Sequence, residues 1–457
     1  MLNPQATNDI EYVLDSVPEY DAFLTVDELN ASSKRLAEAH PEIVRLTTIG
    51  RSTLGEPIPM LRIGSGPKQL LFFACPHPNE PIGAMMLEAL AGLLVDNAAL
   101  RGETYTWNLI KCIDPDGTRL NEGWFKGPFT VTHYASNFYR PGATQQAEWT
   151  FPITHKNYDF LHPIQETQAL MTAITALRPV FIYSLHNAGM GGGYFYLTPH
   201  TPKVDDMLRA LITDRGIPLA LGEPEMPWGV ELSPAIFKTP SMRDQYDFLE
   251  ANTDEDPATK LAMGGGSYDF ASGVCNPAHL IVELPYFFDP RTADLSPDTG
   301  TRREAILAGV ERSLEIISFL DEILKRLQGE LTEPTSLRDS SLEIVGMMAS
   351  NLEAKRAWAN KDPDLDTPVT VAQRFDSALG FRFYQLLFVG MVRRAIEAQM
   401  AVRGSQALTE ALAEVETRFA AWAAEMESDL EYKAIPIKTL VEIQLGAALH
   451  FIRAQEA

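Results

Sequence analysis

The chain has 457 residues, of which 45% are hydrophobic and 22% are charged, a balance typical of folded globular proteins. Its formal net charge of -23 excludes nucleic acids and membrane surfaces as main partners, because clustered lysine and arginine bind the phosphates of both. Three distant cysteines suggest neither a disulfide framework nor a thiolate metal site. With no signal-peptide pattern and no apolar run of membrane-spanning length, we expect the chain in the cytoplasm.

The chain then alternates helix and strand patterns. Thr25 and Glu28 have the spacing of a capping box before a helical pattern that ends near residue 40. A further helix is predicted from Pro81 to about Asp96 and another over residues 164–177. Apolar and β-branched runs predict strands over residues 43–52, 57–65, 69–75, 105–113, 180–187 and 279–287. This alternation predicts an α/β fold, with a mixed twisted sheet flanked by helices.

Strand patterns end near residue 301. Residues 301–328 form one long amphipathic pattern, and a segment with Gly, Pro and Ser follows it. From residue 341 to residue 457 the pattern is helical, with breaks at residues 361–368 and 432–438. We therefore expect an α/β domain over residues 1–330 and an all-helical domain over residues 341–457. The helical domain is expected to be a packing appendage or a surface for homo-oligomer formation rather than part of a site.

Metal-binding side chains follow two of the predicted strands. His77 comes directly after one strand and Glu80 lies at the start of the next helix, which fits either a hydrogen-bonded turn or two metal ligands. His186 ends a second apolar strand and is followed by small residues. Two histidines and one glutamate leave a tetrahedral Zn2+ with one open position, the arrangement used for hydrolysis.

Glu283 is an acidic residue within an otherwise apolar strand. A lone buried carboxylate is costly unless it is paired or functional, so Glu283 is either part of a buried salt bridge or a general base beside the metal. An oxyanion and an anionic substrate also need hydrogen-bond donors and positive charge, and Arg119, Asn137 and Arg140 are the candidates.

The order of these motifs resembles a known family. "HPNE", "DPDG", "SLHNAG" and "IVELPYF" are similar to motifs of the zinc carboxypeptidases of the funnelin type, with the related aspartoacylase and succinylglutamate desuccinylase-like deacylases. The resemblance covers roughly residues 20–325, the catalytic domain. It implies that Zn2+ is bound by His77, Glu80 and His186, and that Glu283 is the general base and acid.

Other residues match the family pattern less closely. By the resemblance, Arg119 polarises the scissile carbonyl, and Asn137 and Arg140 hold the terminal carboxylate, although two residues separate them here. Tyr268 matches a position that shapes the specificity pocket, or else is a core aromatic. Leu261 stands where the family has a mobile tyrosine, and the candidates to replace that tyrosine are Tyr194, Tyr196 and Tyr246.

The resemblance implies a hydrolase. We expect a zinc metallocarboxypeptidase that cleaves the C-terminal bond of a peptide. A zinc-dependent deacylase or amidase acting on small N-acyl amino acids or amino-acid conjugates is the alternative. A non-catalytic binding protein is less favoured, because such a protein has no need of the base Glu283.

Overall fold

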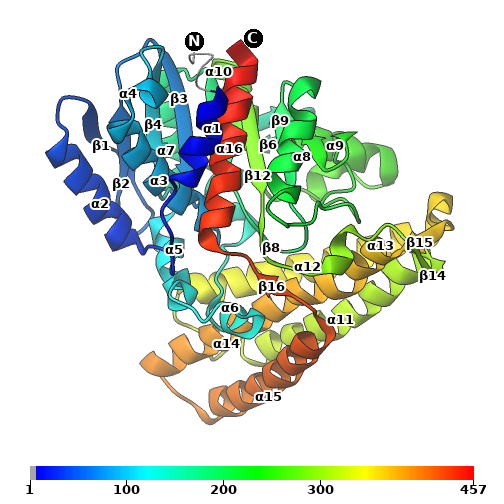
Figure 1. Ribbon diagram of the computed structural model, residues 1–457. Helices are drawn as coiled ribbons and strands as arrows, with labels where there is room; N and C mark the ends of the chain where they lie inside the picture. Colours follow the sequence, from blue (N-terminus) through cyan, green and yellow to red (C-terminus); the bar gives the residue numbers. More distant parts are fainter. Residues whose placement is uncertain (1–6, 457) are drawn as a thin grey trace.

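A nine-stranded mixed sheet forms the centre of the computed structural model, which describes residues 7–456 (Figure 1). The strand order is β1-β2-β4-β3-β7-β12-β9-β11-β10. The strands are β1 (Val44–Arg51), β2 (Pro57–Ile63), β3 (Lys68–Ala74), β4 (Tyr105–Ile110), β7 (Phe181–Leu185), β9 (Tyr194–Thr198), β10 (Glu231–Ser233), β11 (Ile236–Lys238) and β12 (Ala278–Glu283). Strands β4, β3, β7 and β12 run parallel to one another, and β9 runs parallel to β11. The pairs β1–β2, β2–β4, β12–β9 and β10–β11 are antiparallel. The predicted mixed sheet is confirmed.

The parallel strands are buried on both faces. Alternate side chains of β3 enter different hydrophobic clusters: Leu70 and Phe72 pack on one side, and Leu71 and Phe73 on the other. This two-residue period explains why β3 reads as a continuous apolar run in the sequence.

Helices cover the two faces of the sheet (Figure 1). Packed together on one side are α1 (Thr7–Asp15), α2 (Val26–Ala39), α3 (Ile82–Asp96), α8 (Asp205–Thr213) and α16 (Ile437–Glu456). The other side holds α7 (Gln165–Leu177) and α10 (Ser267–Val274). The predicted capping box of α2 is present, with the Thr25 hydroxyl accepting from the Glu28 amide.

Shorter elements connect these layers. They are α4 (Ala98–Arg101), α5 (Pro115–Asn121), α6 (Val131–Asn137), β5 (Ile153–His155), β6 (Tyr158–Phe160), β8 (Ala188–Met190), α9 (Met242–Asn252), β13 (Pro285–Phe288), β14 (Pro297–Thr301), β15 (Pro368–Thr370) and β16 (Lys433–Ala434). The helical region below the sheet in Figure 1 contains α11 (Arg302–Arg326), α12 (Ser336–Lys361), α13 (Val371–Phe375), α14 (Phe381–Val402) and α15 (Gln406–Asp429).

The last helix leaves this helical region and returns to the sheet. Strand β16 pairs with β13, and α16 then packs against α3, α1 and α8, beside the N-terminal helix in Figure 1. The structure therefore distributes residues 341–457 differently from the two-domain prediction: the division at residue 341 falls inside α12, and α16 belongs to the sheet layers. Helical periodicity identifies α16 as a helix but not the surface that buries it. The homo-oligomer expected through the helical region stays a prediction.

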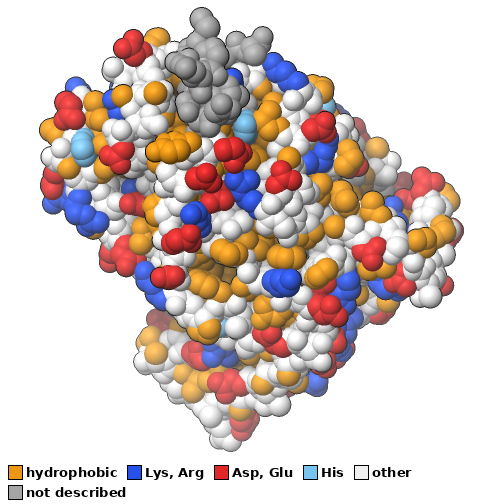
Figure 2. All heavy atoms as spheres, in the orientation of Figure 1, with side chains coloured by type: hydrophobic (Ala, Val, Ile, Leu, Met, Phe, Trp, Pro, Cys, Tyr) orange, Lys and Arg blue, Asp and Glu red, His pale blue; other side chains and the backbone are white. Residues whose placement is uncertain are grey.

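Charge is mixed over the face drawn in Figure 2, where acidic and basic side chains lie interspersed. Among residues 7–456, no helix combines the length and the apolar character that a membrane crossing requires.

We expect Leu445→Ala, in α16, to lower the free energy of unfolding by about 2–5 kcal/mol, because Leu445 is fully buried and its truncation leaves a cavity. Urea denaturation measures the change. Leu342→Ala, at a 46% exposed position in α12, is the control and should cost less than about 0.5 kcal/mol. Equal, small effects at both positions would show that α16 is not part of the cooperative core.

Candidate metal centre

Three side chains meet where strands β3 and β7 end. The strands are parallel neighbours, with Ala74 opposite Leu185, so the segments that follow them emerge at the same edge of the sheet. His77 and Glu80 lie in the turn between β3 and α3, and His186 comes directly after β7. The turn starts at Cys75, a non-glycine residue with a φ of 54°, a strained conformation that is common beside functional sites.

The donor atoms of this group face one another. The Nδ1 atom of His77 is 3.1 Å from Glu80 Oε1, and the Nδ1 atom of His186 is 3.2 Å from Glu80 Oε2. The two Nδ1 atoms are 3.2 Å apart. Donor atoms around a tetrahedral zinc with bonds of about 2.1 Å lie about 3.4 Å from each other, so the observed spacing fits the ion. The group satisfies the geometry of a three-ligand metal site.

The three side chains are buried in protonation states that suit a metal ligand. His77, Glu80 and His186 are at most 6% exposed. Burial, with Arg140 nearby, lowers the pKa of His77 to about 3, which keeps its imidazole neutral as a metal ligand requires. Burial opposes ionisation of Glu80, but His77, hydrogen bonds from both histidines and Arg140 hold the pKa of its carboxyl below the usual range.

A chain of hydrogen bonds sets the tautomer of His186. Its Nε2 atom is 2.8 Å from Ser184 Oγ, and that hydroxyl is 3.3 Å from Glu148 Oε2. Since the Ser184 hydroxyl donates to the carboxylate, it accepts from His186 Nε2–H, which leaves the lone pair of Nδ1 directed at the metal position. Glu148 is held in turn by Ser267, whose amide and hydroxyl donate to Oε1 at 2.8 and 2.6 Å.

These supporting residues were not found from the sequence. Ser184 did carry a signal, because it lies two residues before His186 on the same strand and therefore on the same face. Glu148 and Trp149, whose ring lies 5.2 Å from that of His77, come from a short helical turn that no strand-end pattern indicates.

Glu283 ends β12, the parallel neighbour of β7, and lies beside the metal ligands. Its Oε1 atom is 4.0 Å from His186 Nδ1, and the residue is 8% exposed. Burial raises the pKa of the Glu283 carboxyl well above its usual range, and Glu80 and Glu225 raise it further, whereas Arg140 lowers it. Among the described residues no lysine or arginine forms an ion pair with Glu283, so the alternative of a buried salt bridge to such a residue is not observed.

Arg140 is the guanidinium that reaches this group. Its Nη1 atom donates to Glu80 Oε1 at 2.9 Å, and its Nε atom donates to Gln146 at 3.0 Å. The guanidinium also lies over the ring of Trp149, 5.3 Å from its centroid. These contacts fix Arg140 beside the metal position.

The other predicted site residues have different partners. Arg119, on α5, donates to Glu56 at 2.5 and 2.9 Å and to Asp27 at 2.7 Å. The side-chain amide of Asn137 donates to the backbone of its own helix, and the ring of Tyr268 packs against His279. None of the three has a hydrogen bond or an ion pair with the metal ligands or Glu283 in the part of the chain described, so their functional roles stay predictions.

The structure also shows the surroundings of Leu261, which stands where the family has a mobile tyrosine, and of the three tyrosines that could replace it. Leu261 is buried in a small hydrophobic cluster that includes Tyr246. The hydroxyl of Tyr246 donates to Asn157, whereas Tyr194 and Tyr196 donate to Glu225. Of the three candidate tyrosines, only Tyr194 is paired with Glu283 across the sheet.

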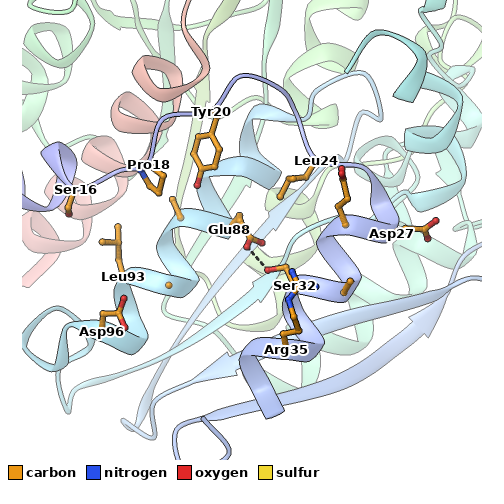
Figure 3. A pocket seen from close by; sticks show the side chains of 14 residues that line it. Ser16, Pro18, Tyr20, Leu24, Asp27, Ser32, Arg35, Glu88, Leu93 and Asp96 are labelled. Atoms are coloured by element: carbon orange, nitrogen blue, oxygen red, sulfur yellow. Dashed lines mark hydrogen bonds between the residues drawn. The ribbon is translucent and has the colours of Figure 1, made fainter. Parts of the chain in front are cut away.

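A separate cavity of about 810 Å³ lies between α2 and α3 (Figure 3). Ser32 donates to Glu88 within it, and Arg35 and Asp96 lie on its walls. Its lining includes none of the metal ligands, nor Arg140 or Glu283, so the cavity is not part of the metal centre.

Comparisons with known proteins agree with this geometry. The family model "zinc carboxypeptidase" matches residues 29–286. The gamma-D-glutamyl-L-diamino acid endopeptidase 1 of Lysinibacillus sphaericus is 30% identical over 112 residues, which cover 22% of this chain and 27% of that protein. The match thus spans about a quarter of that relative's length.

The solved structures that this chain matches include carboxypeptidases. The carboxypeptidase A of Helicoverpa armigera has 14% sequence identity and a TM-score of 0.35, with 78% of this chain and 80% of that chain covered. A metallo-carboxypeptidase from Burkholderia cenocepacia has 13% identity and a TM-score of 0.32, with 73% and 70% covered. The family match spans more than half of the sequence, and the chain therefore belongs to the zinc carboxypeptidase family.

Proposed function

We propose that this zinc metallohydrolase is a metallocarboxypeptidase, which hydrolyses the C-terminal bond of a peptide. In this proposal His77, Glu80 and His186 hold the metal. The observation that carries the proposal is the carboxylate of Glu283, buried 4.0 Å from a metal ligand and without a lysine or arginine partner among the described residues. A protein that only binds peptides has no need of such a group.

The residues of the site divide the chemistry between them. Bound Zn2+ supplies a Lewis acid that polarises a carbonyl and lowers the pKa of water to about 7. Glu283 takes a proton from the attacking water and then delivers it to the leaving amine. Arg140 donates hydrogen bonds to the oxyanion or to the substrate carboxylate, and its Nη2 atom has no partner among the described residues that would compete.

A deacylase or amidase of small N-acyl amino acids is the second candidate. It is favoured by the position of Asn137, whose side-chain amide donates to the carbonyl of His133 in its own helix and so does not pair with Arg140 as the clamp for a peptide terminus would require. A panel of blocked dipeptides and N-acyl amino acids, compared by kcat/KM, separates the two activities.

We also place the enzyme in the cytoplasm. Cys75 and Cys112 are buried, free thiols, and Cys75 is close enough to raise the pKa of Cys112 in addition to the effect of burial. Adjacent thiols that stay reduced are typical of a reducing compartment.

We expect Glu283→Gln to bind zinc at close to one ion per chain, measured by atomic absorption, and to lose about 10²–10⁴-fold in kcat, because the amide cannot accept the proton. The control is Glu103→Gln, which alters an exposed carboxylate two residues before the start of β4. Turnover of Glu283→Gln at the wild-type rate would remove the role assigned to Glu283.

Ser184→Ala should weaken zinc binding by about 10–100-fold, because it breaks the link that orients His186. Competition with a chromophoric chelator measures this affinity. Ser272→Ala removes a hydroxyl that donates only to the backbone of α10, and should bind zinc like the wild type. Equal affinities in both variants would contradict the orienting role of Ser184.

Arg140→Lys should lower kcat/KM by about 10²-fold, because lysine lacks the planar fork that can hold Glu80 and the substrate together. Arg119→Lys, at a site already occupied by Glu56 and Asp27, should change kcat/KM less than about threefold. A larger loss for Arg119→Lys than for Arg140→Lys would return the catalytic role to Arg119.

A further inference from the structure

Glu225 has an unusual set of contacts beside the metal centre. It lies in the segment between α8 and β10, and the hydroxyls of Tyr194 and Tyr196 both donate to its Oε2 atom, at 2.9 and 2.8 Å. Its Oε1 atom has no hydrogen-bond partner, and its carboxylate forms no ion pair with a lysine, arginine or histidine in the described chain. Half of this carboxylate is therefore available to a ligand.

The strand register places Glu225 next to the catalytic region. Strands β9 and β12 are antiparallel, and Tyr194 lies directly opposite Glu283. Residues that face each other across such a pair have side chains on the same side of the sheet, and Tyr196, two residues on, shares that side. The two tyrosines thus hold Glu225 on the face from which Glu283 acts. Consistently, the charge of Glu225 is one of the influences that raise the pKa of Glu283.

Aromatic rings cluster on one side of Glu225, whose side chain is exposed and is held by the hydroxyls of Tyr194 and Tyr196. The ring centroids of Tyr194 and Tyr196 are 5.6 Å apart, and Phe237 of β11 lies 6.1 and 5.7 Å from them. Tyr384 reaches the same region from α14, where its hydroxyl accepts a hydrogen bond from the Gly189 amide. Burial raises the pKa of Tyr384, and Glu225, Glu283 and Glu80 raise it further. A carboxylate among aromatic rings is the combination that attracts an ammonium or guanidinium group.

The charges of the site are also unbalanced. Glu223, only two residues before Glu225, has both oxygens bonded by Arg302 at 2.6 and 2.5 Å. Glu225 has no such partner, and Arg140 is the cation that acts on Glu283 and Glu80 nearby. A substrate that carries a positive charge would balance Glu225, whereas a negatively charged side chain would be repelled.

We propose that Glu225, with Tyr194, Tyr196 and Tyr384, forms a subsite for the cationic side chain of a substrate, an ammonium or guanidinium group close to the scissile amide. The proposal rests on the proposed function in so far as Glu283 marks where the amide is cleaved. It assigns the enzyme a substrate class: amides of basic amino acids.

Matched substrates test this subsite. Hippuryl-lysine and hippuryl-norleucine differ mainly in the ammonium group, and the wild-type enzyme should prefer the lysine substrate in kcat/KM by at least about 10-fold. Glu225→Gln keeps the shape and still accepts the tyrosine hydrogen bonds, so it should bring the ratio of kcat/KM for the lysine substrate to that for the norleucine substrate close to one, whatever common effect the lost charge has on Glu283. Glu103→Gln is the control and should leave both values unchanged.

Two results would overturn the subsite. One is a wild-type enzyme without a preference for the lysine substrate. The other is an equal loss for both substrates in Glu225→Gln, which would mean that Glu225 only fastens its segment to β9.

A binding measurement separates the subsite from the reaction. In zinc-loaded Glu283→Gln, calorimetry should give tighter binding of Nα-acetyllysine than of Nα-acetylnorleucine, and adding Glu225→Gln should abolish the difference. If neither hippuryl substrate is hydrolysed but this difference persists, the proposed function fails and the subsite stands. If hippuryl-norleucine is hydrolysed but no difference in binding appears, the subsite fails and the hydrolase stands.

Discussion

The parallel pairing of β3 with β7 is the constraint on which the metal centre depends. Glu80 is buried between two imidazoles whose Nδ1 atoms are 3.2 Å apart. The Asn187 backbone amide and the Arg140 guanidinium each donate one hydrogen bond to the carboxylate. A divalent cation held by the three side chains would add a further attraction, so metal binding and the stability of this edge of the sheet would be coupled.

Arg140 illustrates what can and cannot be predicted from a sequence. His77, His186 and Glu283 could be proposed because each follows or lies within an apolar strand, where a polar residue needs a reason, and Glu80 because it stands three residues after His77. Arg119, on α5, and Arg140, in an irregular segment, carry no such signal. Which guanidinium contacts the candidate metal ligands is decided by partners distant in the chain: Glu56 and Asp27 bind Arg119, and Glu80 binds Arg140.

The sheet was predicted more completely than the arrangement of the helices. Strand positions follow from local apolar runs, and the mixed, helix-flanked sheet follows from their alternation with helices, but the order of the strands was not predicted. The place of α16 depends instead on contacts between segments at opposite ends of the chain. Gln444 donates to the carbonyl of His186 across a separation of 258 residues, a pairing that no local pattern contains.

The glycines after His186 have a specific structural reason. The sequence suggests that small residues there let a ligand approach the backbone, but at Gly189 the neighbour is protein: a Cβ atom would lie 2.5 Å from the ring of Phe383 on α14. The adjacent Tyr384 accepts from the Gly189 amide, while Gln444 of α16 holds the His186 carbonyl three residues earlier. The segment that carries the third metal ligand is thus fixed by two C-terminal helices. A change in how α14 packs would therefore shift this segment, so the packing of the helical region and the geometry of the candidate metal site are linked.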